Sequence, residues 1–228
     1  MKQFTMILAA VLMNAVAFAY QKQNTKPFTE ISFAISGTAF VTKGSTHSVE
    51  IKGDKNDLED IKVEVEDGRL IIKSKDGQGW FTTNSHSDVK VYITTSDISY
   101  IAVSGSGELI GQSKFDTDDL NISVSGSGHV QFQADAKDVD MRISGSGSIE
   151  LSGTGDKGDL SISGSGKLDA EEFVANAYEI SISGSGSCKI NVKEEIESSI
   201  SGSGSIMYKG NPSKINNKSS GSGKIRKI

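Results

Sequence analysis

The sequence predicts an all-β fold, a β-solenoid whose coils of about 19 residues stack on one another. The first observation is the tetrapeptide Ser-Gly-Ser-Gly, which occurs seven times. The second is its spacing, since neighbouring copies are separated by 21, 19, 19, 20, 18 and 19 residues. The third is the alternation of apolar and polar residues around each copy, which is typical of strands. The copies begin at Ser104, Ser125, Ser144, Ser163, Ser183, Ser201 and Ser220.

The glycines of each copy lie on the apolar side of this alternation. One such series is Leu120, Ile122, Val124, Gly126, Gly128, Val130 and Phe132. An inward bend leaves little room for a Cβ and can require a positive φ, so each copy is interpreted as a bend with glycine inside and serine outside. A flexible Gly/Ser linker is the alternative. It fails because a β-branched residue precedes every copy through Ser201, a register that linkers lack.

One position per repeat is predicted to form an internal column. It lies two residues after the second glycine and is occupied by Leu109, Val130, Ile149, Leu168, Cys188, Ile206 and Ile225. Stacking in register would place these side chains above one another in the interior. Cys188 is then expected to be a buried small hydrophobe and not a reactive or metal-binding thiol.

The residues before the repeats also alternate, and they predict a β-rich section that continues into the solenoid. Strands are expected, in chain order, over 28–41, 49–51, 61–65, 70–73, 89–93 and 98–103. Ser36-Gly37-Thr38 resembles a degenerate copy of the repeat bend, and 53–57 reads as a polar turn. Asp67-Gly68 is a tight hairpin signal. No helix is predicted.

The first residues read as an export signal. Residues 1–19 combine Lys2, an apolar core and the Ala17-Phe18-Ala19 cleavage pattern, which makes Tyr20 the expected first mature residue. Residues 20–27 form a polar leader and 28–228 a single β-solenoid domain, divided into an irregular section (28–100) and the seven repeats (101–228). The expected location is periplasmic, cell-surface or extracellular, without a membrane-spanning segment.

The chain offers no pattern typical of catalysis, and we predict no catalytic, cofactor-binding or metal-binding residues. The acids between the repeats alternate with lysines, which favours a solvated mixed-charge ridge; a cation-binding ridge is the alternative. His47, His86 and His129 do not form a zinc-binding pair. The formal charge of −5 argues against a nucleic-acid partner.

Trp80 and Phe81 are the candidate recognition residues. An aromatic pair in a polar loop can stack on a sugar or fill a pocket of a partner. The alternative is that Trp80 folds back and caps the open N-terminal coil.

Several segments together resemble a bacterial family. They are Phe28-x-x-Ile-x-Phe33 with the Ser36-Gly-Thr bend, Val49-Glu-Ile-Lys-Gly53, Asp67-Gly-Arg-Leu-Ile-Ile72 and the repeated Ile-Ser-Gly-Ser-Gly. In this combination the chain resembles the family described as "putative auto-transporter adhesin, head GIN domain", common in Bacteroidetes-type bacteria. The resemblance implies a β-helix-like fold and an adhesive role at the cell surface, and it carries no catalytic residues.

The expected function is a non-enzymatic binding or structural module of the cell envelope, adhesin-like, with an unidentified glycan or protein of the envelope or a host surface as partner. No cofactor is expected, and the sequence does not give the oligomeric state. The alternative is a carbohydrate-active enzyme on the same scaffold, which would need two or three convergent carboxylates in a groove.

Overall fold

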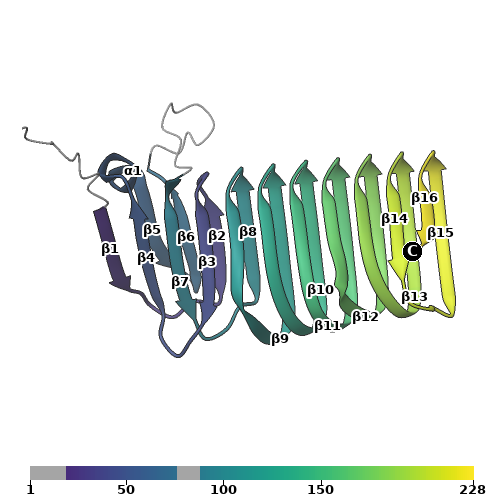
Figure 1. Ribbon diagram of the computed structural model, residues 1–228, viewed down its shortest axis with the longest axis horizontal. Helices are drawn as coiled ribbons and strands as arrows, with labels where there is room; N and C mark the ends of the chain where they lie inside the picture. The colour runs from purple at the N-terminus through teal and green to yellow at the C-terminus, as the bar shows by residue number, and fades with distance from the viewer. Residues whose placement is uncertain (1–18, 76–87) are drawn as a thin grey trace, which may run out of the picture.

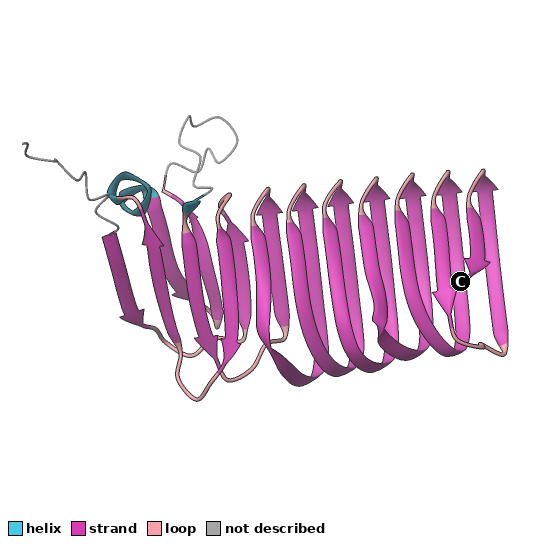
Figure 2. Ribbon diagram, viewed as in Figure 1, coloured by secondary structure: helices cyan, strands magenta, loops and turns pink. Residues whose placement is uncertain are grey.

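The protein is a flattened, two-faced β-solenoid in the computed structural model, which describes residues 19–75 and 88–228 (Figure 1). Each repeat runs down one face, bends at a long corner and returns up the other face to a short glycine corner (Figure 2). The predicted solenoid of about seven turns is therefore confirmed.

Strands β9 to β13 are the central coils, and each contributes to both faces. They are β9 (Glu108–Gly126), β10 (His129–Gly145), β11 (Ser148–Gly164), β12 (Lys167–Gly184) and β13 (Ser187–Gly202). Neighbouring coils pair in parallel with serine opposite serine and glycine opposite glycine at every glycine corner.

The first face is the half of each coil that follows the glycine corner. Its strand order is β1-β4-β7-β3-β9-β10-β11-β12-β13-β14-β16. The strands that belong to this face alone are β1 (Ala19–Asn24), β3 (Thr38–Lys43), β4 (Ser48–Gly53), β7 (Lys90–Thr95), β14 (Ser205–Lys209) and β16 (Lys224–Lys227).

The second face is the half that leads into the glycine corner. Beyond the shared coils it contains β2 (Glu30–Ala34), β5 (Ile61–Glu66), β6 (Arg69–Ser74), β8 (Tyr100–Gly105) and β15 (Lys214–Gly221). The pairing runs β5-β6-β2-β8-β9 at one end and β13-β15 at the other.

From the second corner onward, both glycines of each corner are required by the close approach of successive coils. Gly145 has φ +114°, and a Cβ there would lie 2.5 Å from the carbonyl oxygen of Gly126 in the preceding coil. That oxygen accepts a hydrogen bond of 2.8 Å from the amide of Ser146. Gly147 has an ordinary φ, but its Cβ would lie 2.5 Å from Cγ1 of Val124. The bend predicted from the sequence is thus a ladder of backbone hydrogen bonds that excludes side chains.

The predicted internal column is present. Leu109, Val130, Ile149, Leu168, Cys188 and Ile206 are all buried, and Ile225 is partly buried against the core. Cys188 pairs in register with Leu168 and Ile206. The cysteine therefore packs as one of a row of apolar side chains.

At the long corner, glycines of one coil accommodate aromatic rings of the next. Phe132 lies over Gly111, Phe173 over Gly155 and Tyr178 over Gly158, with any added Cβ within 2.7 Å of the ring. Complementary small and large residues fill the interior here.

The N-terminal section stacks its coils out of chain order. The β2–β3 coil lies between the β6–β7 strands and the β8–β9 strands, because β2 pairs with both β6 and β8 while β3 pairs with both β7 and β9. The Asp67-Gly68 hairpin is confirmed as the β5–β6 turn, and both residues have positive φ.

Two details of this section differ from the sequence expectation. The prediction that the chain has no helix is wrong, because Lys55–Asp60 forms the short helix α1, which begins in the expected polar turn (53–57) and extends beyond it. Leu58 packs against the core, which explains why these polar residues coil there. Strand β1 begins at Ala19, the last residue of the expected export signal, continues into the expected polar leader (20–27) and pairs antiparallel with β4.

Candidate functional site

The repeats hold outward side chains in register, so the two faces and the long corner carry straight columns of polar groups. In adjacent parallel strands, residues of one column are separated by about 4.8 Å. Extended binding surfaces are the usual way in which solenoids act.

A shallow groove of about 510 Å³ lies on the second face. One of its columns contains the small residues Ser161, Ser181 and Ser199, with the long side chains of Arg142 and Lys218 at the two ends. All five side chains are exposed. The small residues between two long ones explain the depression.

A column of carboxylates forms one side of this groove. Asp140, Asp159, Glu179 and Glu197 are successive partners in register. Lys157 bridges two of them, with its Nζ 3.0 Å from Asp159 and 3.4 Å from Glu179. The hydrogen bond to Asp159 raises the pKa of Lys157, so this lysine stays charged beside them. Asp140 is paired as well, with Arg142 at 2.7 Å. The groove thus carries repeating hydroxyl groups beside a column of carboxylates, three of which form ion pairs.

The long corner carries a larger acidic groove of about 970 Å³. Its lining includes Asp97, Asp116, Asp118, Asp119, Asp135 and Asp156. Several of these acids form ion pairs, as Asp118 does with Lys137 at 2.8 Å and Asp116 with Lys43 at 2.8 Å. Over residues 19–75 and 88–228, no group of His, Cys, Asp or Glu is arranged to hold a metal ion. The two ion pairs place lysines among the acids of this corner, as the alternation of acids and lysines in the sequence predicts.

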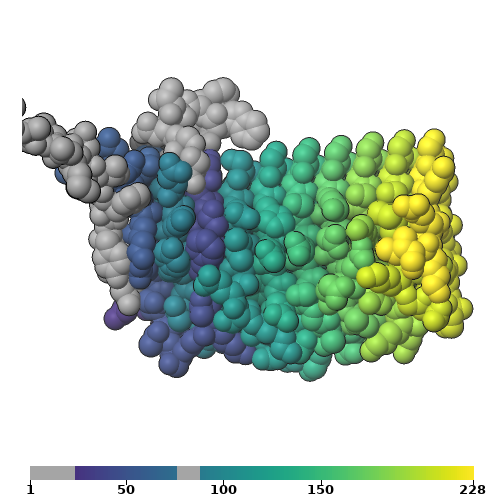
Figure 3. Space-filling view, in the orientation of Figure 1, coloured from purple at the N-terminus to yellow at the C-terminus, as the bar shows by residue number. Residues whose placement is uncertain are grey.

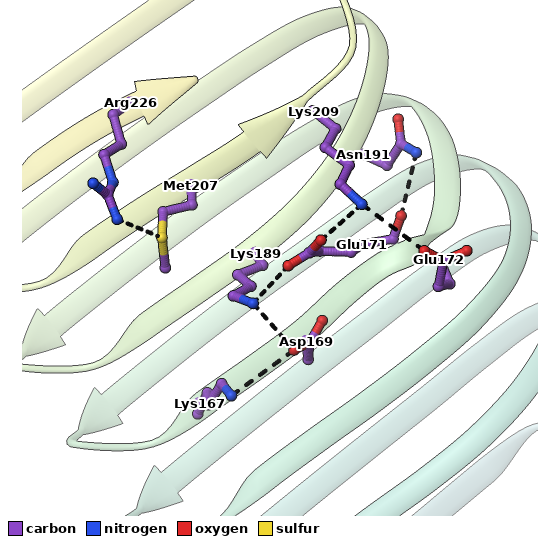
Figure 4. Close-up of polar contacts among 9 residues, drawn as sticks. All are labelled: Lys167, Asp169, Glu171, Glu172, Lys189, Asn191, Met207, Lys209 and Arg226. Carbon is purple, nitrogen blue, oxygen red and sulfur yellow. Dashed lines mark hydrogen bonds and ion pairs between the residues drawn. The ribbon is translucent and has the colours of Figure 1, made fainter. Parts of the chain in front are cut away.

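The most connected ion-pair network lies on the first face, where Figure 4 shows it between β12, β13 and β14. Glu171 lies in a bulge of β12. Its carboxylate oxygens lie 2.6 Å from Nζ of Lys189 and 2.7 Å from Nζ of Lys209. These hydrogen bonds, from Lys189 first and then Lys209, lower the pKa of Glu171 to about 2. The network joins three successive coils and is best explained as a stabilising feature.

The other residues singled out from the sequence are dispersed. Trp80 and Phe81 lie outside the described residues, as does His86, so the recognition and capping roles of the pair stay predictions. His47 contacts the buried Thr95, with 3.2 Å between Nδ1 and Oγ1. His129 instead contacts Ser148, with 2.8 Å between Nδ1 and Oγ.

Cys188 is fully buried, and burial raises the pKa of its thiol to about 12. A thiol in that state is neither a nucleophile nor a metal ligand at physiological pH.

Sequence reasoning missed two surface features. Phe40 and Tyr92 project outward from β3 and β7, with ring centroids 5.3 Å apart and an interplanar angle of 19°. Lys52 lies 4.8 Å from the centroid of Tyr92. The sequence signal for this aromatic pair was an aromatic residue on the polar side of an alternating strand.

The second feature is the serine column of the groove. Its sequence signal was the outward first serine of the repeated Ser-Ile-Ser-Gly.

Comparison with known proteins supports the same architecture. The family model described as "putative auto-transporter adhesin, head GIN domain" matches residues 27–212. None of the curated proteins compared with this chain is significantly similar to it.

Solved structures of three bacterial proteins share the fold. A protein of Bacteroides fragilis described as a putative adhesin has a TM-score of 0.85 and 26% identity, over 93% of this chain and 97% of that one. A Parabacteroides distasonis protein described as a putative lipid binding protein has a TM-score of 0.71 and 26% identity, over 92% and 96%. A putative adhesin of Parabacteroides merdae has a TM-score of 0.72 at 21% identity, over 92% and 96%, and shows the fold alone.

Proposed function

Since this chain belongs to the putative auto-transporter adhesin, head GIN domain family, we propose that it is a non-enzymatic, exported module that binds a hydroxyl-rich polymer such as a glycan strand. The binding site is the groove on the second face. Residues 1–19 act as the export signal, and the protein works in the envelope or at the cell surface. No helix of the described ranges 19–75 and 88–228 is long and apolar enough to cross a membrane.

One observation carries this proposal: the groove presents in-register serine and carboxylate columns along the solenoid axis. Sugars are recognised by hydrogen bonds that protein hydroxyl groups donate or accept and that carboxylates accept, when these groups are fixed in place before binding. Here the parallel strands fix them, and the repeat along the axis matches a polymer better than a compact ligand. The similarity to the Bacteroides fragilis putative adhesin supports a role in adhesion.

A glycan array with purified protein tests the proposal. Ser181→Tyr places a large side chain in the middle of the groove without entering the core, because Ser181 is exposed. Gln131→Tyr is the matched control, an exposed position on the first face of β10. We expect the wild type and the control to bind the same glycans and Ser181→Tyr to lose at least about tenfold in affinity.

Equal binding by Ser181→Tyr, or no glycan binding by the wild type, would contradict the proposal. The bound glycan is recovered and its chain length measured at the same time. Intact chains agree with a binding module, whereas shortened chains would favour the alternative, a carbohydrate-active enzyme.

The name of the Parabacteroides distasonis relative points to a lipid as a second kind of ligand. An internal lipid site would need space between the two faces, and the columns of buried residues from β9 to β13 fill the interior there. We therefore place the proposed ligand on the outer surface.

A further inference from the structure

The charges of this chain are segregated along the solenoid. All 29 acidic residues lie at or before Glu197, whereas six of the 24 basic residues lie after it. The segment after Glu197 therefore carries +6 and the preceding part −11, in agreement with the total of −5. Its cations are Lys209, Lys214, Lys218, Lys224, Arg226 and Lys227. This segment forms the coil of β14, β15 and β16 at one end of the rod, coloured yellow in Figure 3.

Four of these cations have no carboxylate partner among the described residues. Lys209 and Lys214 pair with acids of the neighbouring coils. Lys218 and Lys224 form no such pair, and the other two contact neutral groups: Arg226 approaches Sδ of Met207 at 3.2 Å (Figure 4), and Lys227 binds the side-chain oxygen of Asn211. Their positive charge is therefore available to an external anion.

The same coil exposes apolar side chains. Ile215 and Ile228, with 43% and 47% of their surface exposed, are the large apolar residues that stand out to solvent within the described ranges. Ile215 belongs to an inward column, because it pairs with the buried Ile196. In β15 this column is left uncovered, and β15 is exposed along its whole length.

Unpaired cations lie on both faces of this same coil. Lys218 projects from the second face, since its partner in register is Ser199. Lys224 and Arg226 project from the first face, opposite Ser205 and Met207. Exposed isoleucines together with unpaired cations are the composition that binds the interface of an anionic bilayer, where apolar groups enter the headgroup region and cations contact phosphates.

We propose that the coil of β14, β15 and β16 docks the protein on a membrane surface rich in anionic phospholipids. This inference does not depend on the proposed glycan site, and it explains how the protein is held at an envelope surface. Charges that only prevented edge-to-edge aggregation could be of either sign or paired with acids. Here all six are of one sign and four lack acidic partners within the described part of the chain. The rest of the chain has the opposite charge, so docking orients the rod with this end toward the lipid.

Vesicle flotation with the purified protein tests the inference. The probes are phosphatidylcholine vesicles with and without roughly one third phosphatidylglycerol. We expect binding only to the anionic vesicles, with a partition coefficient that falls as salt is raised. Lys224→Glu/Arg226→Glu/Lys227→Glu should lower it by at least about 100-fold, since each cation near the surface contributes about fivefold.

Two further variants separate this site from general electrostatics. Lys26→Glu/Lys90→Glu/Lys167→Glu changes the net charge by the same amount at exposed positions away from the coil, and it should bind like the wild type within about threefold. Ile215→Asn should weaken binding severalfold without changing the salt dependence.

The inference is overturned if the two charge variants lose the same affinity for anionic vesicles. It is also overturned if the protein binds neutral vesicles as well as anionic ones, or binds no vesicle at all. Sedimentation of the vesicle-free protein covers one more case. If the wild type forms dimers that the triple variant at this coil abolishes, and vesicles do not bind, the coil is a contact between copies and the inference fails.

Discussion

The replacement of Gly145 by alanine tests the central feature of the fold, the close contact of coils at the glycine corner. The new Cβ would lie 2.5 Å from the carbonyl oxygen of Gly126, and the residue would have to keep φ near +114°. A strained φ of this kind costs about 1–3 kcal/mol. Overpacking against a rigid neighbour adds about 1–3 kcal/mol. We therefore expect Gly145→Ala to lower the free energy of unfolding by about 2–6 kcal/mol.

Two other glycines separate the two contributions. Gly147 has an ordinary φ, but an added Cβ would lie 2.5 Å from Cγ1 of Val124. Gly147→Ala therefore measures the close contact alone and should lower the free energy of unfolding by about 1–3 kcal/mol. Gly68 has φ +78°, and an added Cβ there would have no atom within 4 Å. Gly68→Ala therefore measures the backbone strain alone and should lower the free energy of unfolding by about 1–2 kcal/mol. Ser146→Ala is the control, because the side chain of Ser146 is exposed and only its backbone amide bonds to Gly126. Its free energy of unfolding should lie within about 0.5 kcal/mol of the wild type.

Chemical denaturation followed by circular dichroism measures all four variants against the wild type. If Gly145→Ala is no more destabilising than Gly68→Ala, then the corner is not tightly packed. If Ser146→Ala is as harmful as Gly145→Ala, the loss lies in some other property of the corner. Either result would refute the argument that the glycines are required by the approach of successive coils.

Three further predictions concern the interior and the ion-pair network. Leu168→Ala, in the fully buried internal column, should cost about 2–5 kcal/mol of unfolding free energy in the same denaturation assay. The thiol of Cys188, whose pKa burial raises to about 12, should react with a thiol reagent only as fast as the protein unfolds; stoichiometric labelling of the native protein within the mixing time would contradict its burial. Glu171 has its pKa lowered from 4.5 to about 2 by Lys189 and Lys209, so its contribution is fully present above about pH 4.5 and is lost as the pH falls toward about 2. The stability of Glu171→Gln should therefore depend less on pH over that window than that of the wild type, and equal slopes would show that the network is unimportant.

The repeats could be read from the sequence because their period is set by local geometry. Alternation gives the strand faces, and the recurring glycines mark where no side chain fits, so the register of Val130, Ile149 and Leu168 follows directly. The side chains of these three residues are buried in the structure, as this argument predicts. The same reasoning identified the Asp67-Gly68 hairpin, since its turn needs two positive φ values.

Local patterns could not give the spatial order of the N-terminal section. Nothing in residues 30–43 indicates that β2 and β3 insert between strands that come later in the chain, because such pairing is decided by tertiary contacts. Helix α1 was missed for a similar reason, since only the contact of Leu58 with the core distinguishes it from a polar turn.

The surface features were predictable only in part. The sequence gives the alternation that sends Ser181 and Glu179 outward, but not the depression, which depends on the size of the residues in five neighbouring strands. Likewise, the acid-free segment after Glu197 is visible in the printed sequence, whereas the exposure of Ile215 follows from the lack of a covering strand on the second face.

The inserted position of the β2–β3 coil has a consequence for biogenesis. Its two neighbours are strands β6 and β7 on one side and β8 and β9 on the other, so a nascent chain that has reached only residue 60 has no template for its first coil. From β9 onward each new coil adds to a finished one. Assembly should therefore wait until about half the polypeptide has been synthesised and then extend in one direction like a zipper, as expected for a linear array of repeats.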